Sequence, residues 1–322
     1  MQSSWRKNLS GKTLSLHESH FLPSGLLCPS INFMKGIKKR VRRCFAYFGI
    51  KTILSALKIV PKNLWLSATG VLASILKILF SKQTKIIKEN YKRVYGKEPS
   101  NGFVNEFYRN LIYGSLEVVY AEKKFPDGFE FLVDEGKLEI IDELIKNGKK
   151  VVWVSGHIGN WELLPFYFSL KGYKISVLAR RLYDDRLNER LEKFRKKMGV
   201  NVIYREEEKT GFQLVRALKR DDIVGFLVDQ NIKNVESIES PFLGIPSTTP
   251  SGFARIAMDF SLPVIVGVNI RIKPFRFKIL ISDPIFPEGK TEKEMVDDVN
   301  SILTDFIKLS PEQWMWMHRR WG

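Results

Sequence analysis

The chain contains 322 residues, of which 44% are hydrophobic and 27% charged, a composition typical of a globular protein that buries a sizeable core. Its formal net charge of +17 at pH 7 favours polyanionic partners, namely nucleic acid, anionic lipid headgroups or an acidic protein. The two cysteines, Cys28 and Cys44, lie outside any CxxC pattern, which argues against a disulfide framework or a cysteine-based zinc site and favours a body exposed to the cytosol.

Residues 1–33 show neither helical nor strand periodicity and are predicted to be a disordered leader or the result of a mis-assigned start. Met34 opens a strongly basic run over residues 35–43, which resembles a natural protein start more closely than Met1 does. Translation is therefore predicted to begin at Met34.

Residues 34–80 are predicted to form a basic and apolar membrane-anchoring segment. Four lysines interrupt residues 44–80, and the longest uncharged piece, residues 63–76, is shorter than the roughly 20 residues that a spanning helix needs. Aromatic residues among leucines and basic residues favour a helix in the headgroup region or a short hairpin; an amphipathic helix packed on the body is the alternative. The preceding basic cluster favours the membrane, because anionic lipid attracts each basic group by about 1 kcal/mol. The positive-inside rule then places the body on the cytoplasmic face.

Residues 81–322 are predicted to form one domain of the α/β class. Residues 81–124 are helical in pattern, with apolar side chains spaced for one face. From about residue 133, apolar strands alternate with amphipathic helices, which predicts a mostly parallel central sheet flanked by helices. The predicted strands are 151–154, 174–179, 201–204, 223–228, 264–270 and 275–281, and the predicted helices are 137–146, 161–170, 185–197, 211–219, 251–259 and 291–309.

His157 is the strongest candidate for a general base, because the chain has only four histidines. It follows the strand 151–154, at the carboxyl end where open α/β sheets bind their ligands. Gly156 and Gly159 remove side-chain bulk on both sides, so that a substrate and the backbone can approach the imidazole closely. His318 has aromatic and arginine neighbours and is predicted to be structural.

Glu162 is the candidate partner of His157. Five helical steps would put the two on different faces, but a histidine in the turn and a glutamate in the first turn of the next helix can meet. Glu162 would then hold one ring nitrogen protonated and leave the other to accept a proton from a substrate hydroxyl. The structural alternative is a helix-capping histidine and a solvated glutamate, and the spacing by itself leaves both interpretations open.

His157 and Glu162 after an apolar strand resemble the HX4D/E motif of the glycerolipid acyltransferase superfamily, and their setting resembles the bacterial lipid A biosynthesis (late) acyltransferases. Several segments agree in order over roughly residues 130 to 322. They are similar to the family's second block at 177–180, its third at 226–230, its PFFG and TxxG segments at 241–244 and 248–252, its fourth block at 262–265 and its PEQYLWxHRR ending at 311–321.

The resemblance implies transfer of a fatty acyl group from an acyl thioester, usually on acyl carrier protein, to a hydroxyl of a lipid A precursor or related glycolipid. His157 would deprotonate the hydroxyl, and Glu162 would orient and charge-stabilise His157. The enzyme would work at an anionic membrane surface, on the cytoplasmic face of the inner membrane. No cofactor is expected, and the isolated histidines of the body predict no metal site.

Four residues after predicted strands are candidates to bind substrate under this resemblance. Arg180 and Arg181 would bind phosphate on the acceptor or on the carrier arm, since a guanidinium pairs bidentately with such oxyanions. Asp229 and Gln230 would hydrogen-bond sugar hydroxyls of the acceptor, although Asp-Gln replaces the family's usual Glu-Gly. A surface arginine and an acidic cap are the structural alternatives.

Three further residues complete the predicted site. Thr248 and Gly252 belong to a stretch that would offer hydroxyl and backbone N–H groups at the start of the next helix, a ready anion site, although helix capping explains the same residues. Asn160 lies inside the motif and is a further substrate-binding candidate. Glutamate in place of aspartate at position 162 favours the lipid A branch of the superfamily.

Competing functions have less support. A basic non-catalytic membrane or nucleic-acid binding protein would satisfy the charge, but no nucleic-acid binding motif is present and the densest basic run adjoins an apolar segment, so no nucleic acid partner is predicted. No GxSxG elbow and no P-loop occur. Within acyltransferases, a phospholipid or mannosylated inositol lipid is the alternative acceptor.

Overall fold

The structure is a computed structural model that describes residues 52, 61–182, 184–207 and 209–322. The predicted leader, the predicted start at Met34 and the basic run 35–43 lie outside the described residues. So does most of the apolar stretch before residue 61.

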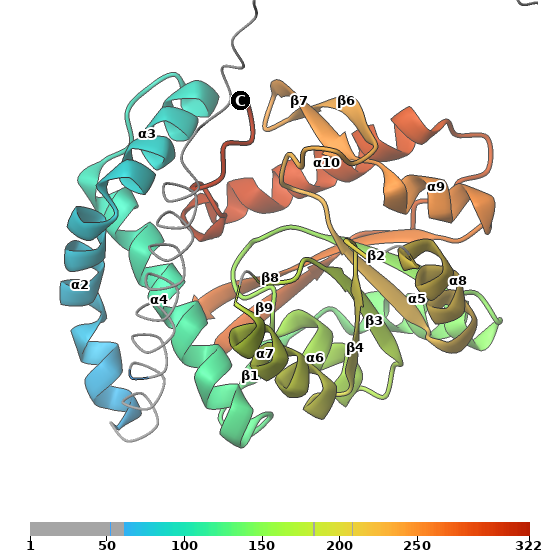
Figure 1. Ribbon diagram of the computed structural model, residues 1–322, viewed down its shortest axis with the longest axis horizontal. Helices are drawn as coiled ribbons and strands as arrows, with labels where there is room; N and C mark the ends of the chain where they lie inside the picture. Colours follow the sequence, from blue (N-terminus) through green and yellow to red (C-terminus); the bar gives the residue numbers. More distant parts are fainter. Residues whose placement is uncertain (1–51, 53–60, 183, 208) are drawn as a thin grey trace, which may run out of the picture. The chain divides into compact units, whose positions relative to one another are not determined.

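A seven-stranded sheet lies at the centre of the described part of the chain (Figure 1). Its order is β1-β9-β8-β2-β5-β3-β4, in which β8, β2, β5, β3 and β4 run parallel while β9 is antiparallel to β8 and β1 parallel to β9. All five residues of β2 are buried, as expected for a parallel strand covered on both faces. The sheet confirms the predicted α/β class. The strands are β1 (Glu130–Leu132), β2 (Val151–Ser155), β3 (Ile175–Ala179), β4 (Val200–Tyr204), β5 (Ile223–Leu227), β8 (Val264–Lys273) and β9 (Arg276–Ile281).

Two helical layers cover the two faces of this sheet. One core contains Val152 and Val154 with residues of α8 (Thr210–Arg220), α9 (Gly252–Asp259) and α10 (Glu292–Leu309). The other contains Val151 and Trp153 with residues of α5 (Glu135–Lys146), α6 (Leu164–Leu170) and α7 (Asp185–Lys197). Alternate side chains of β2 thus point into opposite cores, which is the two-residue period of a strand.

The helical stretch predicted over residues 81–124 is two helices, α3 (Ser81–Tyr95) and α4 (Asn101–Lys124). Gly96, with φ of 71°, ends α3 in the left-handed conformation that glycine adopts readily. Ser100 begins α4 by accepting a hydrogen bond from the backbone N–H of Phe103. The preceding helix, α2 (Lys62–Leu79), packs against α4.

Two predictions about elements need correction. The helix predicted to begin at Trp161 begins at Leu164, and residues 161–163 form turns before it. The antiparallel hairpin of β6 (Ser237–Phe242) and β7 (Ile245–Pro250) was not predicted, because its polar and proline-rich sequence has no apolar alternation. Tertiary contacts stabilise it instead: Asn300 of α10 donates hydrogen bonds to Ser240 and Thr249 of the hairpin.

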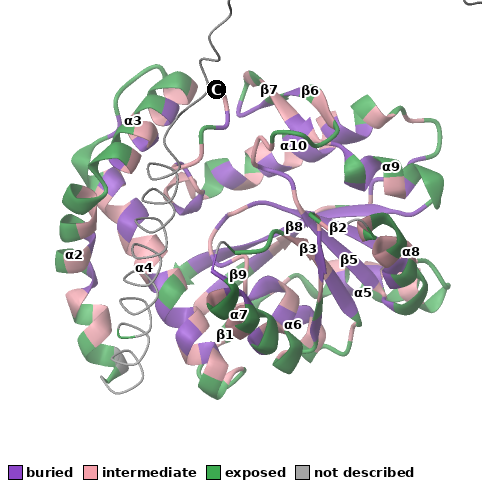
Figure 2. Cartoon of the chain, in the orientation of Figure 1, coloured by how far each residue is buried: buried purple, intermediate pink, exposed green. Residues whose placement is uncertain are grey.

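The outer surface of α2 carries exposed apolar side chains, and Figure 2 shows exposed residues along α2 and α3 beside a largely buried sheet. The exposed side chains are Leu64, Val71, Ile75, Ile78, Leu79 and, directly after the helix, Phe80. Among the described helices, none is by itself long and apolar enough to cross a membrane, whereas α2 and α3 pass that test as a pair bent by 93°.

Candidate active site

His157 lies directly after β2, where Gly156 leads the chain over the end of the sheet. Its ring nitrogen Nδ1 is 2.7 Å from Oδ1 of Asp229, and its backbone N–H donates to Oδ2 of the same carboxylate at 2.8 Å. Asp229 is fully buried and comes two residues after the end of β5, the strand paired with β2. Gly156 lets Asp229 pack closely here, because a Cβ atom would lie 3.3 Å from Cβ and Cγ of Asp229, tighter than an ordinary van der Waals contact.

The ionisation of Asp229 fixes the tautomer of His157. Burial raises the pKa of the Asp229 carboxyl, but the charge of His157 and the hydrogen bonds from His157 and Trp314 outweigh it, so the pKa lies below its ordinary value. An ionised carboxylate only accepts, so Nδ1 of His157 donates to it, and in the neutral imidazole Nε2 then carries the free lone pair. The imidazole therefore has the orientation and tautomer of a general base.

The C-terminal segment completes the support of Asp229. The indole N–H of Trp314, which follows the short helix η1 (Pro311–Gln313), donates to Oδ2 of Asp229 at 2.8 Å. Met315 donates its backbone N–H to the carbonyl of His157 at 3.1 Å. The terminal segment that resembles the family ending is thus part of the site.

A second glycine holds the loop after His157 against the sheet. Gly159 has φ of 59°, and a Cβ atom would lie 1.8 Å from the carbonyl oxygen of Asn269 in β8. Its backbone N–H donates to the carbonyl of Gln313. Both glycines were predicted to let a substrate and the backbone approach closely, and at Gly159 the backbone of β8 does so, while at Gly156 the nearest atoms belong to the Asp229 side chain.

The contact between Glu162 and His157 that the sequence predicts does not form. The Glu162 carboxylate forms a two-pronged ion pair with the guanidinium of Arg195 in α7, with Nη2 and Oε2 2.8 Å apart. The turns over residues 161–163 delay the helix, so Glu162 precedes α6 instead of lying in its first turn. The carboxylate that binds the imidazole is Asp229, which the sequence suggested as a ligand for acceptor sugars or as an acidic cap. Glu162 still lines the cavity that His157 lines.

A cavity of about 470 Å³, called the first cavity below, opens beside His157. The ladder between β3 and β5 ends at Val177 and Gly225, two residues before both strands end, and the strand ends beyond that pair line the cavity. Gly225 adds no side chain there. The inner wall is apolar and includes Trp153, Leu164, Phe168, Ile175, Leu191 and Ile223.

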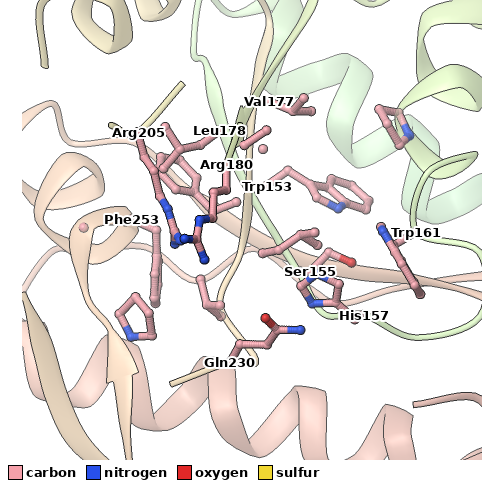
Figure 3. A pocket seen from close by; sticks show the side chains of 18 of the residues that line it. Trp153, Ser155, His157, Trp161, Val177, Leu178, Arg180, Arg205, Gln230 and Phe253 are labelled. Carbon is pink, nitrogen blue, oxygen red and sulfur yellow. The ribbon is translucent and has the colours of Figure 1, made fainter. Parts of the chain in front are cut away.

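Two arginines stand at the first cavity on the side away from His157 (Figure 3). Arg180 follows β3 and Arg205 follows β4, and both contact the carboxylate of Glu206, at 3.5 Å and 3.3 Å. The Arg180 side chain is 75% exposed. Arg205 was not singled out from the sequence. It lies near Arg180 because β4 pairs with β3, and such pairing is a feature of the tertiary structure.

Arg181 points elsewhere. Its guanidinium pairs with Glu207 at 2.6 Å and lies 4.0 Å from the ring centre of Tyr204, and it is not among the residues that line the first cavity. The hydrogen bond to Glu207 raises the pKa of Arg181 above its ordinary value.

The remaining predicted residues separate into two groups. Gln230 and Gly252 line the first cavity. Thr248 lies in β7, where its carbonyl accepts a hydrogen bond from the buried Arg320 at 3.0 Å, so it does not begin a helix. Asn160 is buried and donates to Glu117 at 2.9 Å and to the carbonyl of Gly114, which makes it part of an internal network.

That internal network centres on a buried ion pair. Glu117 of α4 and Arg271 of β8 are almost fully buried, with Nη2 and Oε2 2.6 Å apart. The side chain of Asn269 donates to the carbonyl of Asn160 at 3.1 Å. These contacts tie α4 and β8 to the loop that follows His157. Within the described residues, no group of three or more His, Cys, Asp or Glu is arranged to hold a metal ion.

Comparison with known proteins identifies the family of the chain. Residues 34–322 match the bacterial lipid A biosynthesis acyltransferase family. The chain is also similar to the phosphatidylinositol mannoside acyltransferases of two strains of Mycobacterium tuberculosis, H37Rv and CDC 1551, with 24% identity over 125 and 126 residues. These matches cover 38% of the chain and 40% of each relative. The chain belongs to the bacterial lipid A biosynthesis acyltransferase family.

Proposed function

We propose that this protein is an acyltransferase that moves a fatty acyl chain from a thioester donor, with acyl carrier protein as the carrier, to a hydroxyl of a lipid A precursor or related glycolipid. The observation that carries the proposal is an apolar cavity that opens beside a correctly oriented histidine. Its lining suits a hydrocarbon chain, and its polar end suits an ester-forming reaction.

His157 acts as the general base in this reaction. Nε2 takes the proton of the acceptor hydroxyl while the hydroxyl oxygen forms a bond to the thioester carbonyl carbon. The tetrahedral intermediate then expels the thiolate as the C–S bond breaks, and the imidazolium returns its proton to that sulfur. Asp229 is a positioning residue, because it holds Nδ1 and stabilises the imidazolium charge through a 2.7 Å hydrogen bond.

Arg180 and Arg205 bind a phosphate group of the acceptor or of the carrier arm. They contribute two positive charges against the one negative charge of Glu206, and a guanidinium suits a phosphate because its N–H groups match two oxygens. Gln230 lines the same cavity, which supports a role in hydrogen-bonding the acceptor sugar.

The enzyme works at the cytoplasmic face of the inner membrane. The exposed apolar side chains of α2 support contact with lipid, since monomeric soluble proteins seldom expose such a stripe. The net charge of +17 supports attraction to anionic headgroups.

A phospholipid or mannosylated inositol lipid is the second candidate acceptor, favoured by the similarity to the phosphatidylinositol mannoside acyltransferases. Both acceptors present a hydroxyl and a phosphate. The reaction at His157 would be the same.

The proposal is tested by incubating purified full-length protein with palmitoyl-acyl carrier protein and each candidate acceptor, and identifying the products by mass spectrometry. Wild-type protein is expected to add one acyl group to a lipid A precursor, and His157→Ala to lose at least about a hundredfold in rate, the usual contribution of a general base. Ser301→Ala, an exposed change in α10, is the control and is expected to keep full activity. Transfer to water alone, or an undiminished His157→Ala rate, contradicts the proposal.

A further inference from the structure

A second cavity of about 460 Å³ lies between α4 and α7. Its lining is mainly apolar and includes Leu111, Val118 and Val119 from α4 and Leu187, Leu191 and Phe194 from α7. The lining residues of α4 extend from Asn110 to Glu122, twelve helical steps or about 18 Å. An ion pair of 2.7 Å between Glu122 and Arg190 joins the two helices at one end.

The two cavities meet next to His157. Trp161, Glu162, Leu182 and Leu191 line both of them. The Trp161 ring packs edge-on against the imidazole, with ring centres 5.0 Å apart, and it lines both cavities, whereas His157 lines only the first. Glu162 is held in this shared wall by its ion pair with Arg195.

We propose that the second cavity holds a hydrocarbon chain of the acceptor lipid while the first holds the acyl chain of the donor. This inference rests on the proposed function, and it assigns a lipid-binding site to the groove between α4 and α7.

Two arguments support this occupant. Attack requires the donor carbonyl and the acceptor hydroxyl to be at Nε2 of His157 together, so two chains must leave the same point in different directions. The cavities share Trp161, whose ring packs against the imidazole, and from there one is lined by residues of β3 and β5 and the other by residues of α4 and α7.

The chemistry of the lining favours an alkyl chain over a sugar or a peptide. The groups between Leu111 and Val119 that face the cavity are aliphatic apart from Gly114 and Ser115, and the charged Glu122 and Arg190 neutralise one another at the end. Burying apolar surface gives about 25 cal/mol per Å², whereas hydroxyl groups would lose their hydrogen bonds to water there.

The test uses photolabelling, which needs no turnover. The probe is a dodecyl maltoside with a diazirine on its chain, added to full-length protein saturated with a palmitoyl-pantetheine thioether that cannot be cleaved. The thioether fills the first cavity, so label on peptides of β3 and β5 is expected to fall. Label on the α4 and α7 peptides that contain Val118 and Phe194 is expected to persist.

Ser115→Trp places an indole in the second cavity from an exposed position on α4. It is expected to reduce labelling of α4 and α7 by on the order of tenfold, which is about 1.4 kcal/mol of lost binding. Ser301→Trp makes the same change at an exposed position of α10, outside both cavities, and is expected to leave the labelling unchanged. If Ser115→Trp fails to fold, Val118→Phe serves in its place.

Two results overturn the inference: labelling of α4 and α7 that the thioether removes, which would make both cavities donor sites, or no labelling there even at saturating probe. An acyl-transfer assay on the same wild-type sample separates this failure from failure of the proposed function. Active protein without label refutes only the second site, whereas labelled protein without any acyl transfer refutes the proposed reaction.

Discussion

At the scale of single residues, the site depends on which atom of one imidazole carries a proton. Asp229 accepts three hydrogen bonds, two from His157 and one from Trp314, and it accepts them in a fully buried place. A carboxylate in such surroundings must be ionised to satisfy its donors, and this holds His157 in one tautomer.

Replacing Asp229 by Asn is expected to reduce kcat by about 10² to 10⁴ with little change in KM, because the amide can stabilise the wrong tautomer and cannot balance the imidazolium charge. The measurement is kcat and KM as a function of pH, with circular dichroism to verify the fold. Glu162→Gln is the comparison. It breaks the charge balance with Arg195 and is expected to lower the free energy of unfolding. Its kcat is expected to fall less than that of Asp229→Asn. The reverse ranking, with Glu162→Gln the slower enzyme, would return Glu162 to the role first predicted for it.

His318 is expected to make stability depend on pH. Burial lowers its pKa from 6.5, and Arg320 and His157 lower it further while Asp229 raises it. The unfolded chain then binds a proton more readily than the folded chain, so stability is fully present above pH 6.5 and falls as the pH drops toward the folded pKa. Melting temperatures of wild type and His318→Gln across this range measure the effect. The melting temperature of the variant is expected to change less with pH than that of the wild type. An equal dependence on pH in both proteins would show that His318 does not cause it.

At the scale of elements, the C-terminal segment contacts the loop that carries His157 and its partner Asp229, although it is more than 150 residues away from His157 in sequence. Trp314 donates to Asp229, while Trp316, equally buried, donates to the carbonyl of Pro311. The two tryptophans therefore form a matched pair for experiment.

Trp314→Phe and Trp316→Phe remove the same atoms from the same core and are expected to cost similar stability. Only Trp314→Phe removes a donor from Asp229, a loss of about 1.5 to 3 kcal/mol for a hydrogen bond to a charged group. Its kcat is expected to fall by about tenfold or more relative to Trp316→Phe, measured at equal folded concentration. Equal rates would show that the indole contributes packing alone.

The buried pair of Glu117 and Arg271 is an element-scale contact that joins α4 to β8. Glu117→Gln leaves a buried guanidinium without its counter-charge and is expected to destabilise the fold by about 3 to 5 kcal/mol. Glu89→Gln removes an exposed partner of Lys85 and is expected to cost at most about 1 kcal/mol. Urea unfolding measures both, and a small effect of Glu117→Gln would show that solvent or other groups replace the lost charge.

At the scale of the whole molecule, the distribution of apolar surface predicts how the enzyme meets lipid. Ile78 is 75% exposed on α2, among other exposed apolar side chains. Ile78→Glu is expected to weaken binding to vesicles of anionic lipid severalfold, because a buried charge in the lipid interface is unfavourable. Leu309→Glu is the control, since Leu309 is 66% exposed at the end of α10. Flotation of the proteins with vesicles gives the comparison, and equal binding would exclude α2 from the membrane contact.

The sequence by itself determined the α/β class, the succession of most strands and helices along the chain, and the position of His157 after β2. Apolar runs of five or six residues between amphipathic helices leave few alternatives, and the carboxyl end of such a strand is where a catalytic loop belongs. The ordered motifs, ending with residues 311–321, determined the family.

Only the tertiary structure decided which carboxylate serves His157. The resemblance to the HX4D/E motif favoured Glu162, five residues away, whereas the β2–β5 ladder brings Asp229, 72 residues away, to hydrogen-bonding distance. The same holds for Arg195, Arg205 and Trp314, and for the two cavities, because each depends on segments that meet through the sheet register. A short sequence pattern predicts the local structure of its own segment. It does not predict which strands pair or how segments pack, and these set the distances between residues far apart in the chain.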